Sequence, residues 1–526
     1  MSETASPHAA LAKSTKNRAT KNSATRDSGT KDGGPENGAP GNDSTKSGPA
    51  ESSTTNAPDS GSTTNGPAES LATSGAASGA LLPSLVPLLR EWLPRQRWFA
   101  GKGQPVTGFS LVSATEMLPV DGGGSGPGLL HLLVRVQQPA LSARAADDCY
   151  QLLLGVRTSL PPRLASALIG RVAHGPLAGR TVYDGLHDPR LAGLLLERFR
   201  CPGVLGPLRF DRTSPIPPGL TPRVLDTEQS NSSLVYGDAY ILKIFRRVFP
   251  GTNPDLELPL ALTREGCGRV PAPVAWFEAT VPEALTLGVL QPFLHGARDG
   301  WQLALGALAE GRDFLPQARA LGRATAEVHT ALAAALPTPA LGGSQTRHLV
   351  AGMTQRLEAA AQAVPALVPY VPGLRTAFDA VAALGHRGHD WAAQRIHGDL
   401  HLGQTLCSDD GFWSLIDFEG EPSRPLPERR RPQPPVRDVA GMLRSFDYAA
   451  RSHHPWNAEW AARCRAAYCE GYAEAAGADP RGEPELLRAH ETDKAVYEVL
   501  YEARHRPDWL PVPMAAIHRL ATATTV

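Results

Sequence analysis

Apolar residues repeat along the chain at two spacings, and each spacing predicts a different element. Leu85, Leu88, Leu89 and Trp92 lie three or four positions apart, so they fall on one face of a helix. The runs "FSLVSATEML" and "LLHLLVRVQQ" follow, separated by the glycine-rich segment "PVDGGGSGPG". We expect these two runs to be strands joined by that loop.

A second strand-rich stretch begins after residue 220. The segment "VLDTEQSNSSLVYGDAYILKIFRR" predicts two strands around a turn at Gly237 and Asp238. Asn253 and Pro254 are typical of a helix start, and "VAWFEA" and "LTLGVLQPFL" predict two further strands. From about residue 300, Ala/Leu/Arg-rich amphipathic stretches predict helices. The chain is therefore expected to be an α+β protein with a small β-rich part before a larger helical part.

Composition divides the chain further. Residues 1–80 are rich in Ser, Thr, Gly, Asn and Pro, and such a segment cannot bury enough apolar surface to offset the entropy lost on ordering. We expect a disordered tail there. A Gly/Pro-rich stretch near 200–220 predicts a boundary. The expected division is a subdomain at 81–200, a β-rich lobe at 201–294 and a helical lobe at 295–526.

Charge and cysteine usage narrow the classes of partner. Lys plus Arg and Asp plus Glu both total 52, which gives no general attraction to nucleic acid or to an anionic membrane. None of the 6 cysteines forms a C-x-x-C pair, and no apolar run is long enough to span a membrane. Without a secretory signal in the sequence, the cytoplasm is the expected location.

The segment "RIHGDLHLGQTL" carries the strongest candidate chemistry, and it has three interpretations. The two histidines around Asp399 are compatible with a metal-dependent hydrolase, or with a polar turn that Asp399 caps. The spacing also matches a phosphotransferase catalytic loop, in which Asp399 takes the acceptor's proton and Gln404 binds a metal. Asp417, at the end of the buried run "WSLID", stands where such an enzyme has its second metal-binding residue, which favours the phosphotransferase.

The strand-rich part then has to supply a lysine for the nucleotide phosphates. Lys243 lies among apolar residues in "YILKIF", and Glu257 is the expected partner that fixes its position. The turn "EQSNSS" offers small polar side chains to phosphate, although it is also compatible with an ordinary hairpin loop. Its candidates are Gln229, Ser230, Asn231 and Ser232. Gln291, in "LQPFL", lies where backbone groups of a kinase linker contact adenine.

The chain resembles the aminoglycoside-phosphotransferase-like small-molecule kinases, and among them the maltokinases. The resemblance rests on "LPRQRWFAGKG", "EQSNSSLVYGD", "LKIFRRVFPGTNPDLEL", "RIHGDLHLGQTL", "LIDFEGEPSRPLPERRRPQPPVRDVAGMLRSFDYAA" and "KAVYEVLYEARHRPDWLPVP". It implies a bilobal protein-kinase-like fold with an N-terminal cap, and transfer of phosphate from ATP, with Mg²⁺, to the anomeric hydroxyl of maltose. We further expect a monomer that feeds α-glucan synthesis alongside trehalose synthase and a maltosyltransferase.

The sugar site is expected beside Asp399. In "ETDKAVYEVLYEARH", Glu491, Lys494, Tyr497, Glu498, Tyr501 and His505 share one helical face. The pattern is compatible with a solvated, ion-paired face, and the resemblance favours a sugar-binding role for Lys494, Tyr497 and Tyr501. His401 is a further substrate candidate, although bracing of its own loop is favoured. Two alternatives remain open: a kinase for another acceptor, such as an aminoglycoside or choline, and a catalytically inactive binding module.

Overall fold

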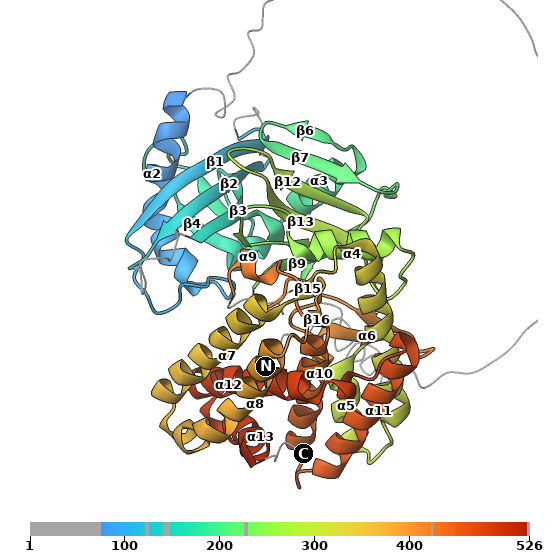
Figure 1. The fold of residues 1–526 in the computed structure, drawn as a ribbon. Coiled ribbons are helices and arrows are strands. Elements are labelled where there is room, and N and C mark those ends of the chain that lie inside the picture. Colours follow the sequence, from blue (N-terminus) through green and yellow to red (C-terminus); the bar gives the residue numbers. More distant parts are fainter. Residues whose placement is uncertain (1–74, 121–125, 140–147, 226–229, 422–423, 523–526) are drawn as a thin grey trace, which may run out of the picture.

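The computed structural model describes residues 75–522 except 121–125, 140–147, 226–229 and 422–423. Figure 1 shows an upper part built around two sheets and a lower part built almost entirely of helices. This is the predicted α+β, bilobal arrangement. Most of the predicted tail, residues 1–74, lies outside the described residues. Helix α2 (Gly75–Trp92) begins within the last residues of that predicted tail.

The first sheet, which belongs to the predicted cap, has the strand order β1-β2-β3-β5-β4, and β11 also pairs with β3. Its strands are β1 (Gly108–Leu118), β2 (Gly128–Gln137), β3 (Asp148–Arg157), β4 (Leu168–Arg171), β5 (Thr181–Asp184) and β11 (Arg247–Val248). The two runs expected as strands are thus confirmed as β1 and β2. Strand β11 comes from the range predicted for the next lobe, so the two ranges share a sheet.

Burial on both faces explains why β2 is apolar almost without interruption. Leu130 and Leu132 pack in one core with Leu85 and Leu89 of α2. The alternate residues Leu129 and Leu133 pack in a different core, shared with the second sheet. Because side chains of a strand alternate between its faces, a strand between two cores needs apolar residues on both. The cap sheet is thereby attached to the neighbouring lobe through its own strands.

The second sheet is antiparallel, with the order β6-β7-β12-β13-β10-β9-β8. Its strands are β6 (Gly203–Leu205), β7 (Leu208–Arg212), β8 (Pro222–Leu225), β9 (Ser232–Tyr236), β10 (Tyr240–Ile244), β12 (Ala275–Ala279) and β13 (Leu285–Pro292), accompanied by helices α3 (Pro189–Arg200) and α4 (Pro254–Arg264). The turn between β9 and β10 has positive φ at Gly237 and Asp238, as a tight hairpin requires. The Asn253 side chain accepts a bond from the Asp255 backbone N–H, which confirms the predicted helix start.

The helical part surrounds one large core. Its helices are α5 (Gly300–Ala309), α6 (Leu315–Ala335), α7 (Gly343–Ala363), α8 (Val371–His386), α9 (Leu426–Arg429), α10 (Val436–Arg451), α11 (Ala458–Ala476), α12 (Pro484–His505) and α13 (Pro511–Thr522). Short strands complete it: β14 (Arg298–Asp299), β15 (Ala340–Leu341), β16 (Trp391–Ala392), β17 (Thr405–Cys407) and β18 (Trp413–Leu415). The loop that carries Asp399 lies between β16 and β17, and Asp417 follows β18.

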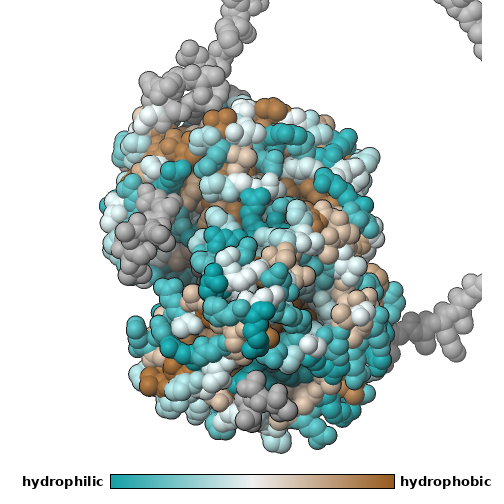
Figure 2. Space-filling view, in the orientation of Figure 1, coloured by the Kyte–Doolittle hydropathy of each residue, from teal (hydrophilic) through white to brown (hydrophobic). Residues whose placement is uncertain are grey.

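The surface is mostly hydrophilic, as expected when the apolar residues are buried in internal cores. Figure 2 shows hydrophilic side chains over most of one face, with hydrophobic ones in small separate patches. Among the described helices, none combines the length and the apolar character needed to cross a bilayer.

A buried polar joint connects the two sheets. The His131 Nε2 atom lies 2.9 Å from Gln151 Oε1, and Gln151 Nε2 donates to the carbonyls of Phe245 and Leu287, each at 2.8 Å. Burial lowers the pKa of His131 from 6.5 to about 4, with a smaller opposing effect from Gln151. His131 is therefore neutral in the folded protein at neutral pH.

Acid should weaken this joint. Between pH 6.5 and 4 the unfolded chain binds a proton at His131 that the folded chain does not, so stability is lost as the pH falls through this window. His131→Gln removes the titration and keeps an amide near Gln151. We expect the loss in unfolding free energy from pH 7 to pH 4.5 to be smaller in this variant by about 2–3 kcal/mol, measured by urea unfolding. An unchanged loss would contradict the assignment.

Close glycine contacts pack α6 against α11. A Cβ atom built on Gly471 would lie 1.9 Å from the Arg319 carbonyl oxygen, whereas one on Gly193, inside α3, meets nothing within 4 Å. Gly471→Ala should force the helices apart and destabilise the protein by about 1–3 kcal/mol or more. The matched change Gly193→Ala should instead stabilise it by about 0.5–1 kcal/mol. Denaturant unfolding checks both, and equal effects would contradict the close packing.

Candidate active site

The loop that carries Asp399 is fixed by the first turn of α10. The backbone N–H groups of His397 and Gly398 donate to the two carboxylate oxygens of Asp438, at 2.8 and 2.9 Å. Burial raises the pKa of Asp438, but the bonds from His329 and Gly398 outweigh it, so the pKa lies below its ordinary value. The loop is therefore held by an ionised carboxylate. Sequence reasoning missed Asp438, for which an acidic residue early in a helix was the available signal.

His397 and His401 face inward and support the same loop. The His397 Nε2 atom lies 3.0 Å from the carbonyl oxygen of Ile416, the residue before Asp417. The His401 Nδ1 atom accepts a 3.1 Å bond from the Gly403 N–H, and burial lowers the pKa of His401 to about 4. A neutral, buried histidine that bonds its own loop fits the bracing interpretation.

Lys494, on α12, lies directly beside Asp399. Its Nζ atom is 3.0 Å from Asp399 Oδ1 and 3.0 Å from Glu421 Oε1, and it stands 5.0 Å from the ring centre of Tyr497. Burial lowers the pKa of Lys494, but the two carboxylates raise it above its ordinary value. The lysine is therefore charged, and Tyr501 extends the aromatic surface with its ring 6.2 Å from that of Tyr497.

The two glutamates of the predicted α12 face pair with arginines instead of Asp399, and His505 packs only against Tyr501, 4.8 Å between ring centres, among the ring contacts of the described residues. Glu491 pairs with Arg465, and Glu498 pairs with Arg444, each at 2.7 Å. Both glutamates are buried, and His505 is exposed. Helix α12 is enclosed on several sides, so its polar residues form internal ion pairs in addition to lining the site.

Cationic side chains surround the carboxylate of Glu421. Besides Lys494, its carboxylate accepts from Arg424 at 2.7 Å and from Arg437 at 2.9 Å. Burial raises the pKa of Glu421, but Lys494, Arg437 and Arg424 together hold it well below its ordinary value. The charge of this glutamate is thus already compensated by three cations.

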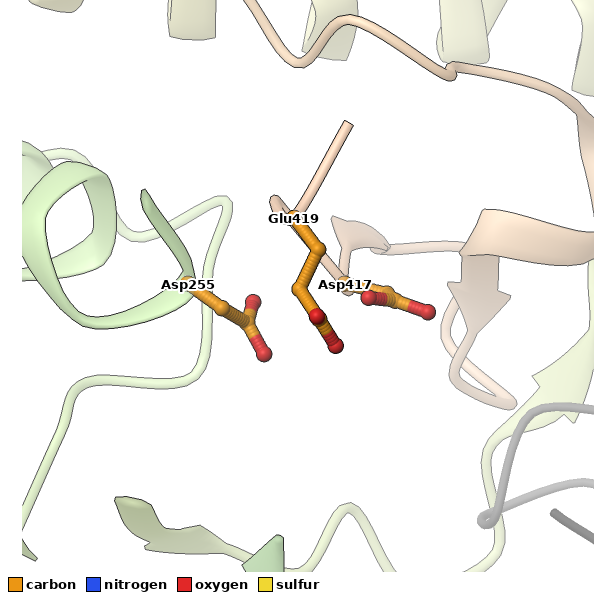
Figure 3. A group of neighbouring side chains, drawn as sticks. All are labelled: Asp255, Asp417 and Glu419. Atoms are coloured by element: carbon orange, nitrogen blue, oxygen red, sulfur yellow. The ribbon is translucent and has the colours of Figure 1, made fainter. Parts of the chain in front are cut away.

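Lys243 has acidic neighbours, whereas the neighbours of Glu421 are basic. Its Nζ atom is 2.9 Å from Asp255, 2.7 Å from Asp417 and 2.7 Å from Glu419. We call these three acidic residues the carboxylate cluster. Figure 3 shows the three as neighbouring side chains, with Asp255 from α4 and the other two from the segment after β18. Their ligand atoms all lie within 4.8 Å of one another.

The predicted partner of Lys243 was wrong. Glu257 does not contact the lysine; its carboxylate lies 2.9 Å from Arg395 and 3.7 Å from Arg430. Asp255 takes the expected place and also accepts a 2.7 Å bond from the Phe418 N–H. Two residues apart on a helix are separated by about 200° around its axis, so only one of the pair can face Lys243.

Asp417 and Gln404 meet at the edge of the carboxylate cluster. Gln404 Nε2 lies 3.3 Å from Asp417 Oδ2. Burial raises the pKa of Asp417, but Lys243 outweighs it, so the pKa lies below its ordinary value. Asp417 also has a φ of 67°, a strained value for a residue with a side chain. Carboxylate and amide oxygens are the donors that Mg²⁺ prefers, so these residues fit such an ion.

The predicted phosphate loop reaches the same cluster through Asn231. Its Nδ2 atom donates to Glu419 Oε1 at 2.6 Å, a contact that sequence reasoning did not foresee. Ser230 is exposed, and Ser232 accepts a 2.8 Å bond from Arg246. Gln229 lies outside the described residues. Gln291, near the end of β13, donates to the Pro271 carbonyl at 3.2 Å.

Two family models match the chain. Residues 92–188 match the maltokinase N-terminal cap domain, and residues 215–480 match the phosphotransferase enzyme family. A glucosamine kinase from Streptacidiphilus jiangxiensis is 30% identical over 55% of this chain and 71% of its own length. A glucosamine kinase from Mycolicibacterium smegmatis is 30% identical over 57% of this chain and 79% of its own length.

Solved structures agree on the fold. A glucosamine kinase, crystal form B, has a TM-score of 0.61 at 22% identity and covers 83% of this chain and 99% of its own. A glucosamine kinase in complex with glucosamine, ADP and inorganic phosphate has a TM-score of 0.58 at 23% identity, covering 82% and 98%. The chain thus belongs to the phosphotransferase enzyme family of aminoglycoside phosphotransferase-like kinases and carries the N-terminal cap domain of maltokinases.

Proposed function

We propose that this kinase transfers the γ-phosphate of ATP to the anomeric hydroxyl of maltose, and that the maltose 1-phosphate formed feeds α-glucan synthesis. The observation that carries the proposal is the bridge that Lys494 makes between Asp399 and Glu421, at 3.0 Å to each. It places a charged amine and the Tyr497 ring beside the proposed catalytic base. An amine donor with an aromatic surface suits a neutral, hydroxylated acceptor.

In the proposed reaction Asp399 orients the acceptor hydroxyl and takes its proton. A new bond forms between that oxygen and the γ-phosphorus, while the bond from phosphorus to the bridging oxygen of the β-phosphate breaks and ADP leaves. Lys243 compensates phosphate charge, with Ser230, Asn231 and Ser232 nearby. Catalysis of this type comes mostly from positioning and from electrostatic stabilisation.

Mg²⁺ is proposed to be held by Asp417 and Gln404, and it would supply positive charge to the transferred phosphate. The supporting observation is the donor chemistry: carboxylate oxygens of the carboxylate cluster within 4.8 Å of one another, with the Gln404 amide at their edge. His397 and Asp438 hold the neighbouring backbone, so the two carboxylate-bearing loops keep a fixed relation.

Phosphorylation of glucosamine is the second candidate, because both relatives described above are named glucosamine kinases. Charge argues against it here. An acceptor amine would need an uncompensated carboxylate, but Glu421 is already surrounded by Lys494, Arg424 and Arg437. A second cation next to Lys494 would be repelled.

An acceptor screen tests the proposal directly. Phosphorus NMR of the protein with Mg·ATP and, separately, maltose, glucose, trehalose, glucosamine or an aminoglycoside identifies both the substrate and the attacked hydroxyl. We expect maltose 1-phosphate, and we expect Asp399→Asn to lower kcat on the order of 10²–10⁴-fold. A preference for glucosamine would defeat the maltose assignment. Unchanged turnover in Asp399→Asn would defeat the proposed base.

The two acidic residues of α4 should behave differently. Asp255→Asn is expected to lower kcat by about tenfold or more, because Lys243 and the Phe418 N–H both lose a charged partner. Glu257→Gln, two positions away, is the matched control and should keep kcat within about twofold. Steady-state kinetics with saturating ATP, after melting curves confirm folding, make the comparison. A larger loss of kcat in Glu257→Gln than in Asp255→Asn would support Glu257 as the partner of Lys243, as predicted from the sequence.

A further inference from the structure

Glu419 is not used by the proposed mechanism, although it lies at the centre of the nucleotide side. Its Oε1 atom is 2.7 Å from Lys243 Nζ and accepts a 2.6 Å bond from Asn231 Nδ2. One carboxylate oxygen thus contacts both the lysine and the loop proposed to bind phosphates. A phosphate oxygen would need the same two donors.

A phosphate would have to compete with carboxylates for the N–H donors of Lys243. A lysine ammonium has three N–H donors, and three carboxylates lie within 3 Å of it. Among these four side chains, the carboxylates outnumber the single ammonium. A phosphate that bonds Lys243 therefore has to take the place of one carboxylate, and it is repelled by those that remain.

Glu419 is the carboxylate best able to leave. Asp255 is 4% exposed and is anchored by the Phe418 N–H. Asp417 is 34% exposed but follows a buried strand and contacts Gln404. Glu419 has one more rotatable bond than either aspartate, and its other described side-chain partner, Asn231, belongs to the loop itself.

We propose that Glu419 is a positioning residue that exchanges with a nucleotide phosphate. It holds Lys243 and Asn231 in place until a phosphate oxygen takes over both contacts, and it then turns its carboxylate toward the cation that accompanies the nucleotide, next to Asp417. This inference rests on the proposed function, since it presumes that Lys243 and Asn231 bind phosphate. It makes the cation a condition for tight nucleotide binding, because only a cation compensates the displaced charge.

Titration calorimetry with ADP, first in EDTA and then in excess Mg²⁺, tests the exchange without any acceptor. Glu419→Gln removes the competing charge at equal length, and we expect it to bind metal-free ADP on the order of tenfold more tightly than the unaltered protein. In Mg²⁺ this advantage should disappear or reverse. Glu257→Gln removes a nearby negative charge that does not contact Lys243, and it should bind metal-free ADP as the unaltered protein does.

Glu419→Asp separates charge from reach. It keeps the charge but is one methylene shorter, so it should contact Lys243 and Asn231 less well and fall between the two other proteins in metal-free ADP affinity. Equal or weaker metal-free binding by Glu419→Gln, in a protein that melts normally, overturns the exchange while the nucleotide site stands. Failure of the unaltered protein to bind Mg·ADP at all overturns the proposed function and the exchange together.

Discussion

The half-buried ammonium of Lys243 joins the sheet-rich and helical parts of this kinase at the candidate active site. Among the described residues, its three carboxylate partners come from α4 and from the segment after β18, which are far apart in sequence. A charge removed from water is tolerated only where it is paired. Lys243 therefore requires one relative position of the two parts, in which the carboxylates of both lie next to it. Asp255 fixes that relative position, because its second carboxylate oxygen accepts a hydrogen bond from the Phe418 N–H. The positions of Asp417 and Glu419 follow from it.

The segment from Asp417 to Glu421 serves two opposite electrostatic environments. Asp417 and Glu419 both pair with Lys243, whereas Glu421 pairs with Lys494, Arg424 and Arg437. Residues two apart in an extended chain point the same way, so Glu421 would continue toward Lys243 if the backbone stayed extended. Gly420, with a φ of 73°, changes the direction between the two glutamates. One short segment thereby connects the surroundings of Lys243 with those of Lys494.

Local patterns predicted much of this arrangement, and long-range contacts set the rest. The hairpin at Gly237, the Asn253 cap, and Lys243, Asp399 and Asp417 near the junction of the lobes follow from short-range signals. Asp255 could not be distinguished from Glu257, because the rotation of α4 about its axis depends on packing against β13 and α6. Similarly, the contact of Asn231 with Glu419 spans 188 residues, a separation that no local pattern encodes.

The identity of the acceptor has to be argued from the side chains around Asp399, because membership of the family does not settle which hydroxylated compound is phosphorylated. The matched ranges end at residue 480, and α12 begins at Pro484. Lys494 and Tyr497, on α12, lie beyond the two matched ranges. The charged amine of Lys494 lies between Asp399 and Glu421 and next to the ring of Tyr497. Because the charge of Glu421 is compensated by Lys494, Arg424 and Arg437, this environment supports the proposal of a neutral acceptor over a protonated amino sugar.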